Sequence, residues 1–149
     1  MLRNTGINIG KSICDEGYKN LVGEIIKKSE THNCKIYYPL DVVVSKTLDG
    51  NGVIKEINEV DNDEMILDIG PKTISSIKTI INNSNTVLWN GPAGYFENPN
   101  FQNGTEKILE IISEKTKNDK IFSVAGGGET VAAINKFCLL YTSPSPRDA

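Results

Sequence analysis

Short apolar runs that end in turn-forming residues recur along the chain. The runs occupy residues 42–44, 65–69, 86–89 and 120–124. The first is entirely β-branched and suits a buried strand. The last three end at Gly70, at Asn90-Gly91-Pro92 and at the three glycines that begin with Gly126. Each run is therefore predicted to be a strand that its turn residues end.

Segments with the apolar spacing of a helix lie before and between these runs. Their apolar positions are Leu21, Ile25 and Ile26, then Ile74, Ile77, Ile80 and Ile81, then Ile108, Leu109, Ile111 and Ile112. Strands that alternate with helices indicate βαβ units. We therefore expect an α/β fold with a doubly wound, mainly parallel, Rossmann-like sheet and helices on both of its faces. Ligands of such sheets bind beyond the carboxyl ends of the strands.

Three segments interrupt this alternation. The turn sequence at 49–52 opens an acidic, weakly patterned stretch to Glu64, which we expect to be an exposed excursion or a short hairpin. No strand precedes the first residues, and the Ser/Pro-rich residues 138–149 stand where another strand is due. The sheet is therefore predicted to be truncated at both ends.

Composition restricts the classes of partner. The chain has 149 residues and a net charge of −3, so it has no general attraction for nucleic acid or for a membrane surface. Its cysteines, Cys14, Cys34 and Cys138, form no CxxC pair, and with the single His32 they give no zinc-ligand spacing. We expect reduced thiols and a cytoplasmic protein. No apolar run approaches the roughly 18 residues of a membrane span.

Two glycine-containing motifs suggest phosphate chemistry. Gly10-Lys11-Ser12 resembles the end of a P-loop, but the required first glycine falls at Thr5 and no strand precedes it. The stretch 124–130, VAGGGET, combines a strand end, a glycine turn and a helix start, which lets backbone N–H groups approach an anion. Glu129 either complements the helix dipole there or holds Mg²⁺ on a polyphosphate.

The stretch 89–97, WNGPAGYFE, is a second strand-to-loop transition. We expect Trp89 and Phe96 to pack into the core. Asn90 and Glu97 have side chains that suit hydrogen bonds to a ligand. A carboxylate such as that of Glu97 can accept both hydroxyls of a ribose.

Together these motifs resemble the phosphoglycerate kinase family. WNGPAGYFE, followed by Phe101 and Gly104-Thr105, is similar to the family's signature loop, and GGGET follows at the expected distance. LDIGPKT, PLDVVV and GINIGKS stand in the family's order. We therefore expect residues 1–137 to be a partial nucleotide-binding domain. Residues 138–149 are expected to be a non-family tail, disordered or artefactual.

The resemblance implies a phosphotransferase of glycolysis. Members transfer a phosphoryl group between 1,3-bisphosphoglycerate and ADP, giving ATP and 3-phosphoglycerate. Their N-terminal domain binds the phosphoglycerate and their C-terminal domain the Mg-nucleotide, and every motif here belongs to the latter. We expect the intact protein to be a cytoplasmic monomer with no nucleic-acid or membrane partner. This chain alone is expected to have no turnover.

The resemblance also assigns roles at the glycine turn. Gly126 belongs to the nucleotide site, and the amides of Gly127, Gly128 and Thr130 would face the transferring phosphoryl group as the catalytic groups. Glu129 would hold Mg²⁺ together with ADP or ATP. The family's usual residue there is aspartate, so glutamate lengthens the ligand by one methylene and is expected to alter the affinity for the metal.

The remaining nucleotide contacts come from two other segments. Glu97 would bind the ribose hydroxyls, and Asn90 would line the phosphate path. Leu40 and Pro92 would flank the nucleotide.

Two other classes of protein are compatible with a doubly wound domain. A non-catalytic nucleotide-binding module would bind AMP and ADP alike, whether or not Mg²⁺ is present. An NAD-dependent oxidoreductase would need a glycine fingerprint that the chain lacks, because Val131 stands where the third glycine belongs.

Overall fold

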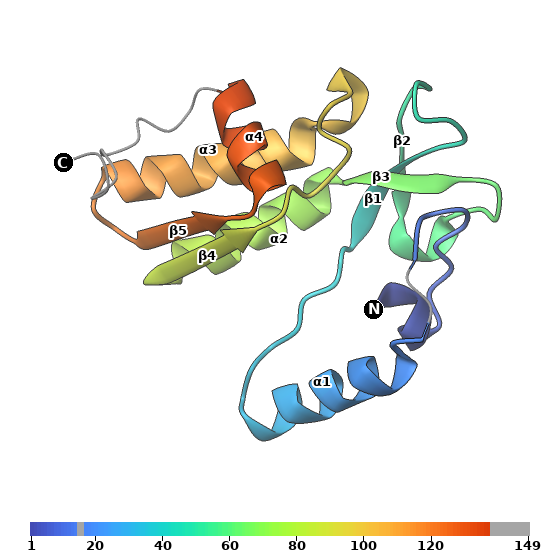
Figure 1. Ribbon diagram of the computed structural model, residues 1–149, viewed down its shortest axis with the longest axis horizontal. Coiled ribbons are helices and arrows are strands. Elements are labelled where there is room, and N and C mark those ends of the chain that lie inside the picture. The colour runs from blue at the N-terminus through green and yellow to red at the C-terminus, as the bar shows by residue number, and fades with distance from the viewer. Residues whose placement is uncertain (15–16, 138–149) are drawn as a thin grey trace. The chain divides into compact units, whose positions relative to one another are not determined.

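The computed structural model describes residues 1–14 and 17–137 and divides the chain into two compact units, between Thr73 and Ile74. Figure 1 labels the helices and strands of both units, numbered in chain order. The predicted α/β class is confirmed, because strands and helices alternate in the second unit around a parallel pair of strands.

The first unit contains an antiparallel sheet. Its elements are η1 (Leu2–Thr5), α1 (Lys19–Thr31), β1 (Asp41–Ser45), β2 (Val53–Glu56), η2 (Ile57–Glu59) and β3 (Met65–Ile69). The strand order is β2-β1-β3, and β1 runs antiparallel to both neighbours. A hairpin is present, but it joins β1 to β2 across the turn at 49–52 instead of lying wholly within residues 49–64. Ile57 and Val60 of the stretch expected to be exposed are buried.

The expectation that the strands at 42–44 and 65–69 lie in a mainly parallel sheet is wrong for this unit. A parallel pair needs a crossover of a dozen or more residues, which is usually a helix. The chain between β1 and β3 instead contains β2 and the short η2 and no crossover helix. Strand β3 therefore runs antiparallel to β1. Among the strands that the structure describes, the parallel arrangement is confined to the second unit.

A buried polar cluster fixes the start of α2 (Pro71–Asn82) within the first unit. Asp41 is 1% exposed. Its carboxylate accepts hydrogen bonds from the backbone N–H groups of Lys72 at 3.0 Å and Thr73 at 2.8 Å, and from the Thr73 hydroxyl at 2.8 Å. Burial raises the pKa of this carboxyl group, but the hydrogen bonds outweigh burial and leave the pKa below its usual value. Asp41 therefore acts as a cap for a helix distant in sequence.

The second unit follows from α2. Its elements are β4 (Thr86–Asn90), η3 (Pro99–Phe101), α3 (Asn103–Lys117), β5 (Phe122–Gly126) and α4 (Gly128–Phe137). Strands β4 and β5 are parallel and joined by α3, so the predicted βαβ unit is confirmed. Figure 1 shows α3 and α4 on one side of this pair, and both helices contact β5.

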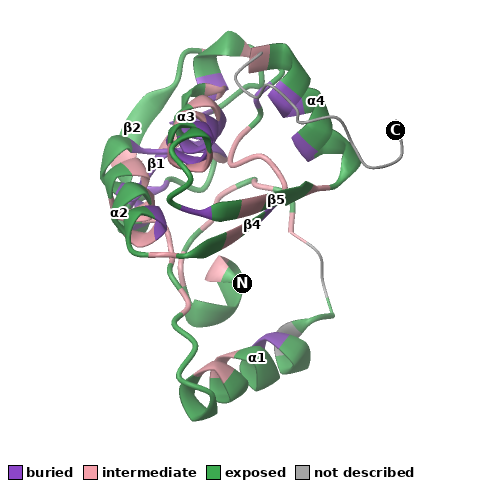
Figure 2. Ribbon diagram, turned by 90° about the vertical axis from the view of Figure 1, so that its left-hand side faces the viewer, coloured by how far each residue is buried: buried purple, intermediate pink, exposed green. Residues whose placement is uncertain are grey.

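The core of the second unit lies under α3. Seven residues of α3 are buried, among them Leu109. Phe101, which lies just before α3, is also fully buried. Figure 2 shows the buried part of α3 in purple. On β4 and β5, Leu88, Phe122 and Val124 are exposed, so one face of the strand pair is uncovered. Within residues 1–14 and 17–137, no helix has the length and apolar character to cross a membrane.

Candidate functional site

The ends of β4 and β5 bring together two motifs that lie far apart in the sequence. The register of the parallel pair places Asn90 opposite Gly126. A Cβ atom on Gly127 would lie only 3.0 Å from Oδ1 of Asn90, so the asparagine side chain lies directly against the glycine turn. This edge holds the carboxyl ends of both strands, where ligands of parallel sheets bind.

The glycine turn leads straight into α4. Gly127 has a φ of 91°, a left-handed conformation that side chains other than hydrogen disfavour. The first hydrogen bond of the helix runs from the Val131 N–H to the Gly127 carbonyl at 3.1 Å. The N–H groups of Gly128, Glu129 and Thr130 therefore precede the helical ladder and form the positive end of its dipole. Gly128 and Glu129 are exposed, so an anion can reach this end.

Thr130 joins the glycine turn to the loop after β4. The residue is 1% exposed, and its Oγ1 accepts a hydrogen bond of 2.7 Å from the backbone N–H of Gly91. The hydroxyl group therefore positions the loop. The predicted phosphate contact of Thr130 concerns its backbone amide and stays a prediction.

The loop itself is held by a second hydroxyl group, from α3. Oγ1 of Thr105, which is fully buried, accepts hydrogen bonds from Ala93 at 3.0 Å and Gly94 at 3.3 Å. Pro92, a predicted nucleotide contact, is half-buried between these anchor points. Nothing in the local sequence pattern indicated this role of Thr105, because its partners lie more than ten residues earlier in the chain.

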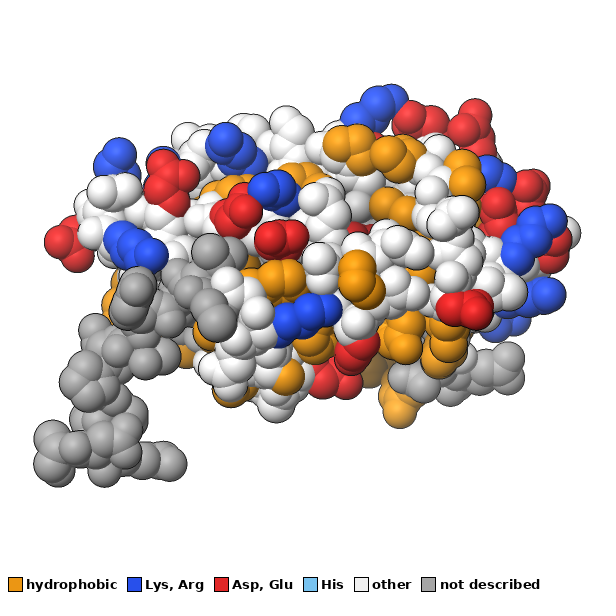
Figure 3. All heavy atoms as spheres, turned by 90° about the horizontal axis from the view of Figure 1, so that it is seen from above, with side chains coloured by type: hydrophobic (Ala, Val, Ile, Leu, Met, Phe, Trp, Pro, Cys, Tyr) orange, Lys and Arg blue, Asp and Glu red, His pale blue; other side chains and the backbone are white. Residues whose placement is uncertain are grey.

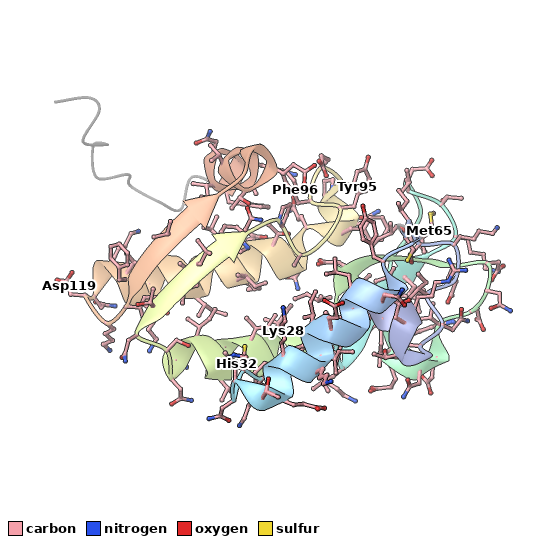
Figure 4. The ribbon with its side chains drawn as sticks, turned by 60° about the horizontal axis from the view of Figure 1, so that its bottom comes forward. Lys28, His32, Met65, Tyr95, Phe96 and Asp119 are labelled. Atoms are coloured by element: carbon pink, nitrogen blue, oxygen red, sulfur yellow. The ribbon has the colours of Figure 1, made fainter. Side chains whose placement is uncertain are left out.

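The last part of the loop carries the second candidate carboxylate. Trp89 and Phe96 are 8% and 6% exposed, so their predicted place in the core is confirmed. Figure 4 shows Tyr95 and Phe96 on this loop. Glu97 follows and is exposed, as a residue that accepts hydrogen bonds from a ligand must be. Lys136 of α4 donates a hydrogen bond of 2.5 Å to the Phe96 carbonyl, a contact that sequence analysis did not predict.

Charge on the surface does not form a broad basic patch at the face drawn in Figure 3. Lysine and arginine side chains there are interspersed with aspartate and glutamate side chains. This agrees with the net charge of −3. Binding of an anion at the glycine turn would therefore depend on backbone N–H groups rather than on a field of lysines.

Comparison with known proteins decides the family. The family model described as phosphoglycerate kinase matches residues 1–143. The chain belongs to the phosphoglycerate kinase family. Phosphoglycerate kinases of Wolbachia pipientis from Culex pipiens and of Francisella philomiragia are each 43% identical to it, over 130 and 138 residues. These alignments cover 87% and 91% of the chain, but only 33% and 34% of those relatives.

Solved structures support the same assignment. The phosphoglycerate kinase of Coxiella burnetii superimposes with a TM-score of 0.86 at 32% identity, covering 93% of this chain and 35% of that one. The enzyme of Pyrococcus horikoshii gives a TM-score of 0.64 at 23% identity, which shows a shared fold. The chain thus spans about a third of the length of the phosphoglycerate kinases that it matches.

Family membership bears on the metal. A Mg²⁺ ion at a nucleotide is commonly bound by one or two carboxylates and the substrate phosphates. Glu129 lies in the first turn of α4, beside the proposed phosphate position, and is exposed, so its chemistry fits such an ion. In the described part of the chain, no group of three acidic, histidine or cysteine side chains could hold a metal without a substrate. The role of Glu129 stays a prediction.

Two predictions concern parts outside this cluster. Leu40 belongs to the first unit, where it is 52% exposed and its N–H donates to Thr73 Oγ1 at 2.9 Å. Its predicted nucleotide contact stays a prediction. The predicted non-family tail at 138–149 lies outside the described residues.

Proposed function

We propose that this chain supplies the nucleotide-binding domain of a phosphoglycerate kinase. The reaction is the reversible transfer of a phosphoryl group from 1,3-bisphosphoglycerate to ADP, a step of glycolysis that gives ATP and 3-phosphoglycerate. One observation carries the proposal: Asn90 and the glycine turn before α4 meet at the carboxyl ends of two parallel strands. Both motifs belong to the family's pattern, and their geometry suits a polyphosphate.

The terminal phosphate of the nucleotide would lie at the amides of Gly127, Gly128 and Thr130. These N–H donors are held in place before the ligand arrives, because the turn is folded and Thr130 is tied to Gly91. Donors fixed in this way stabilise the charge on a transferring phosphoryl group without reorganisation. Asn90 would line the phosphate path from the neighbouring strand.

Four further residues would complete the site of the Mg-nucleotide. Glu97 would accept hydrogen bonds from the two ribose hydroxyls, while Leu40 and Pro92 would flank the nucleotide. Glu129 would hold Mg²⁺, which neutralises charge on the phosphates when it is bound. Glutamate in place of the family's usual aspartate extends the ligand, so we expect binding with an altered affinity, directly or through water.

The activity of the whole enzyme requires more than this chain. Phosphoglycerate would bind to a second domain of the intact protein, and closure of the two domains aligns the reactants and excludes water. We therefore expect no phosphoglycerate-dependent consumption of ATP by the 149-residue chain. We expect the intact protein to be a monomer of the cytoplasm, where the thiols of Cys14 and Cys34 remain reduced.

Calorimetric titration of the chain with nucleotides tests the proposal. ADP with Mg²⁺ should bind more tightly than AMP, and Mg²⁺ should strengthen the binding of ADP to the native chain. Glu129→Ala should lose that strengthening. Equal binding of AMP and ADP, with or without Mg²⁺, would favour a non-catalytic module instead. Binding of NAD in preference to ADP would favour an oxidoreductase.

A further inference from the structure

The loop that carries Glu97 is attached to both ends of α4. At the start of the helix, Thr130 Oγ1 accepts a hydrogen bond from the N–H of Gly91. Near its end, the Lys136 ammonium donates to the Phe96 carbonyl at 2.5 Å. The hydroxyl of Thr105 holds the middle of the loop to α3. The two ends of the loop are therefore tied to α4 and its middle to α3.

Lys136 makes a hydrogen bond and two ring contacts in addition to placing a positive charge near the end of α4. Its ammonium lies 5.8 Å from the ring centroid of Phe96 and 5.6 Å from that of Phe137, so two aromatic faces surround the cation. A hydrogen bond from a charged donor is stronger than one between neutral groups. The acceptor is the carbonyl of the residue directly before Glu97, so this bond fixes the point from which the Glu97 side chain extends.

We propose that Lys136 is a positioning residue for ribose recognition, which it serves by holding the Phe96 carbonyl so that Glu97 meets the ribose hydroxyls. The inference rests on the proposed function, because it takes the ribose contact of Glu97 as given. Lys136 touches no reacting atom. It links the ribose side of the site to the same helix whose N-terminus faces the phosphates, so the two ligand groups are held at a constant spacing.

The first test uses the 149-residue chain without ligand. Lys136→Met keeps the alkyl stem over the rings but removes the charged donor, and Lys136→Arg restores one. Lys115→Met is the matched control, because Lys115 likewise lies in the last turn of its helix, α3. Hydrogen exchange should become faster in Lys136→Met at the amides of Phe96 and Asn98, whose acceptors lie within the loop. Arginine should restore slow exchange, and unchanged exchange in Lys136→Met would overturn the inference.

The second test compares ADP with 2′,3′-dideoxy-ADP, which lacks both ribose hydroxyls. Lys136→Met should weaken ADP binding roughly tenfold and leave dideoxy-ADP within about twofold of the native chain. The double variant Lys136→Met/Glu97→Gln should bind ADP no more weakly than Glu97→Gln alone, because both substitutions remove the same contact with the ribose. If Lys136 had only a structural role, Lys136→Met would weaken the binding of both ligands equally, and its effect on ADP binding would add to that of Glu97→Gln. Either result would overturn the inference.

Failure of the underlying proposal gives a different result. If the native chain binds ADP and dideoxy-ADP equally, Glu97 does not read the ribose, and the role of Lys136 in recognition is overturned with it. Faster exchange at Phe96 and Asn98 in Lys136→Met would then still show that Lys136 holds the loop. If the native chain distinguishes the two ligands and Lys136→Met distinguishes them equally well, only the inference about Lys136 is refuted.

Discussion

The consecutive glycines at 126–128 should differ in what they contribute, and alanine substitutions separate their roles. Gly127 has a φ of 91°, and a Cβ atom there would lie 3.0 Å from Oδ1 of Asn90. Gly128 is the first residue of α4, and a Cβ atom on it would meet nothing within 4 Å. We expect Gly127→Ala to reduce the stability of the fold and Gly128→Ala to reduce ligand binding.

The magnitudes follow from the backbone and the surrounding space. An alanine in the left-handed region costs roughly 1–2 kcal/mol, and the close contact with Asn90 adds to this. The free energy of unfolding should therefore fall by about 1–3 kcal/mol in Gly127→Ala. In Gly128→Ala it should stay level or rise by up to about 1 kcal/mol, because alanine restricts the unfolded chain. The added methyl group would occupy the open space that a phosphate needs, weakening ADP binding roughly tenfold.

Trp89 offers the assay, because it is the single tryptophan of the chain and lies at the end of β4. Urea unfolding followed by its fluorescence reports the second unit, and calorimetry measures the affinity for ADP with Mg²⁺. Equal stability of the two variants would refute the conformational argument for Gly127. Unchanged ADP binding by Gly128→Ala would refute the argument that this glycine gives a phosphate access to the helix N-terminus.

Two further predictions concern buried polar contacts. Asp41→Asn should reduce the stability of the first unit by about 1–3 kcal/mol at pH 7, because the carboxylate accepts charge-assisted hydrogen bonds from the start of α2. Since the folded pKa of Asp41 is lowered, its contribution is present above about pH 4 and is lost as the pH falls through the folded pKa. Acid titration of far-ultraviolet circular dichroism should show this loss in the native chain and not in Asp41→Asn; identical acid profiles would contradict it. Thr105→Val should cost about 1–3 kcal/mol by leaving the N–H groups of Ala93 and Gly94 unpaired, whereas the exposed Thr86→Val should stay within about 0.5 kcal/mol. Equal unfolding midpoints for the two threonine variants, measured by Trp89 fluorescence, would be inconsistent with that role.

Local patterns predicted the elements of the second unit well. The runs at 86–89 and 120–124 form β4 and β5, and the apolar spacing around Ile108 forms α3 between them. These signals are local, since a strand and its terminating turn lie next to each other in the chain. The meeting of Asn90 with the glycine turn then follows from the parallel pairing of two strands whose ends carry these residues.

Strand direction and the loop anchors depend on tertiary contacts instead. A short apolar run looks the same in a parallel or an antiparallel pair, so the antiparallel pairing of β1 with β3 could be recognised only from the missing crossover helix. Thr105 and Lys136 contact loop residues about 11 and 40 positions away. No periodicity links such pairs, and a surface lysine near a helix end is ordinarily a solvated residue.

The central claim is that a Mg-nucleotide binds where β4 and β5 end, with its phosphates at the start of α4. Hydrogen exchange of the 149-residue chain with and without ADP and Mg²⁺ tests this claim most directly. The account predicts slower exchange with the nucleotide at the amides of Gly127, Gly128 and Thr130 and in the loop 91–97, and unchanged exchange in the middle of α3. Unchanged exchange at these three amides with ADP bound, or protection confined to other segments, would contradict it.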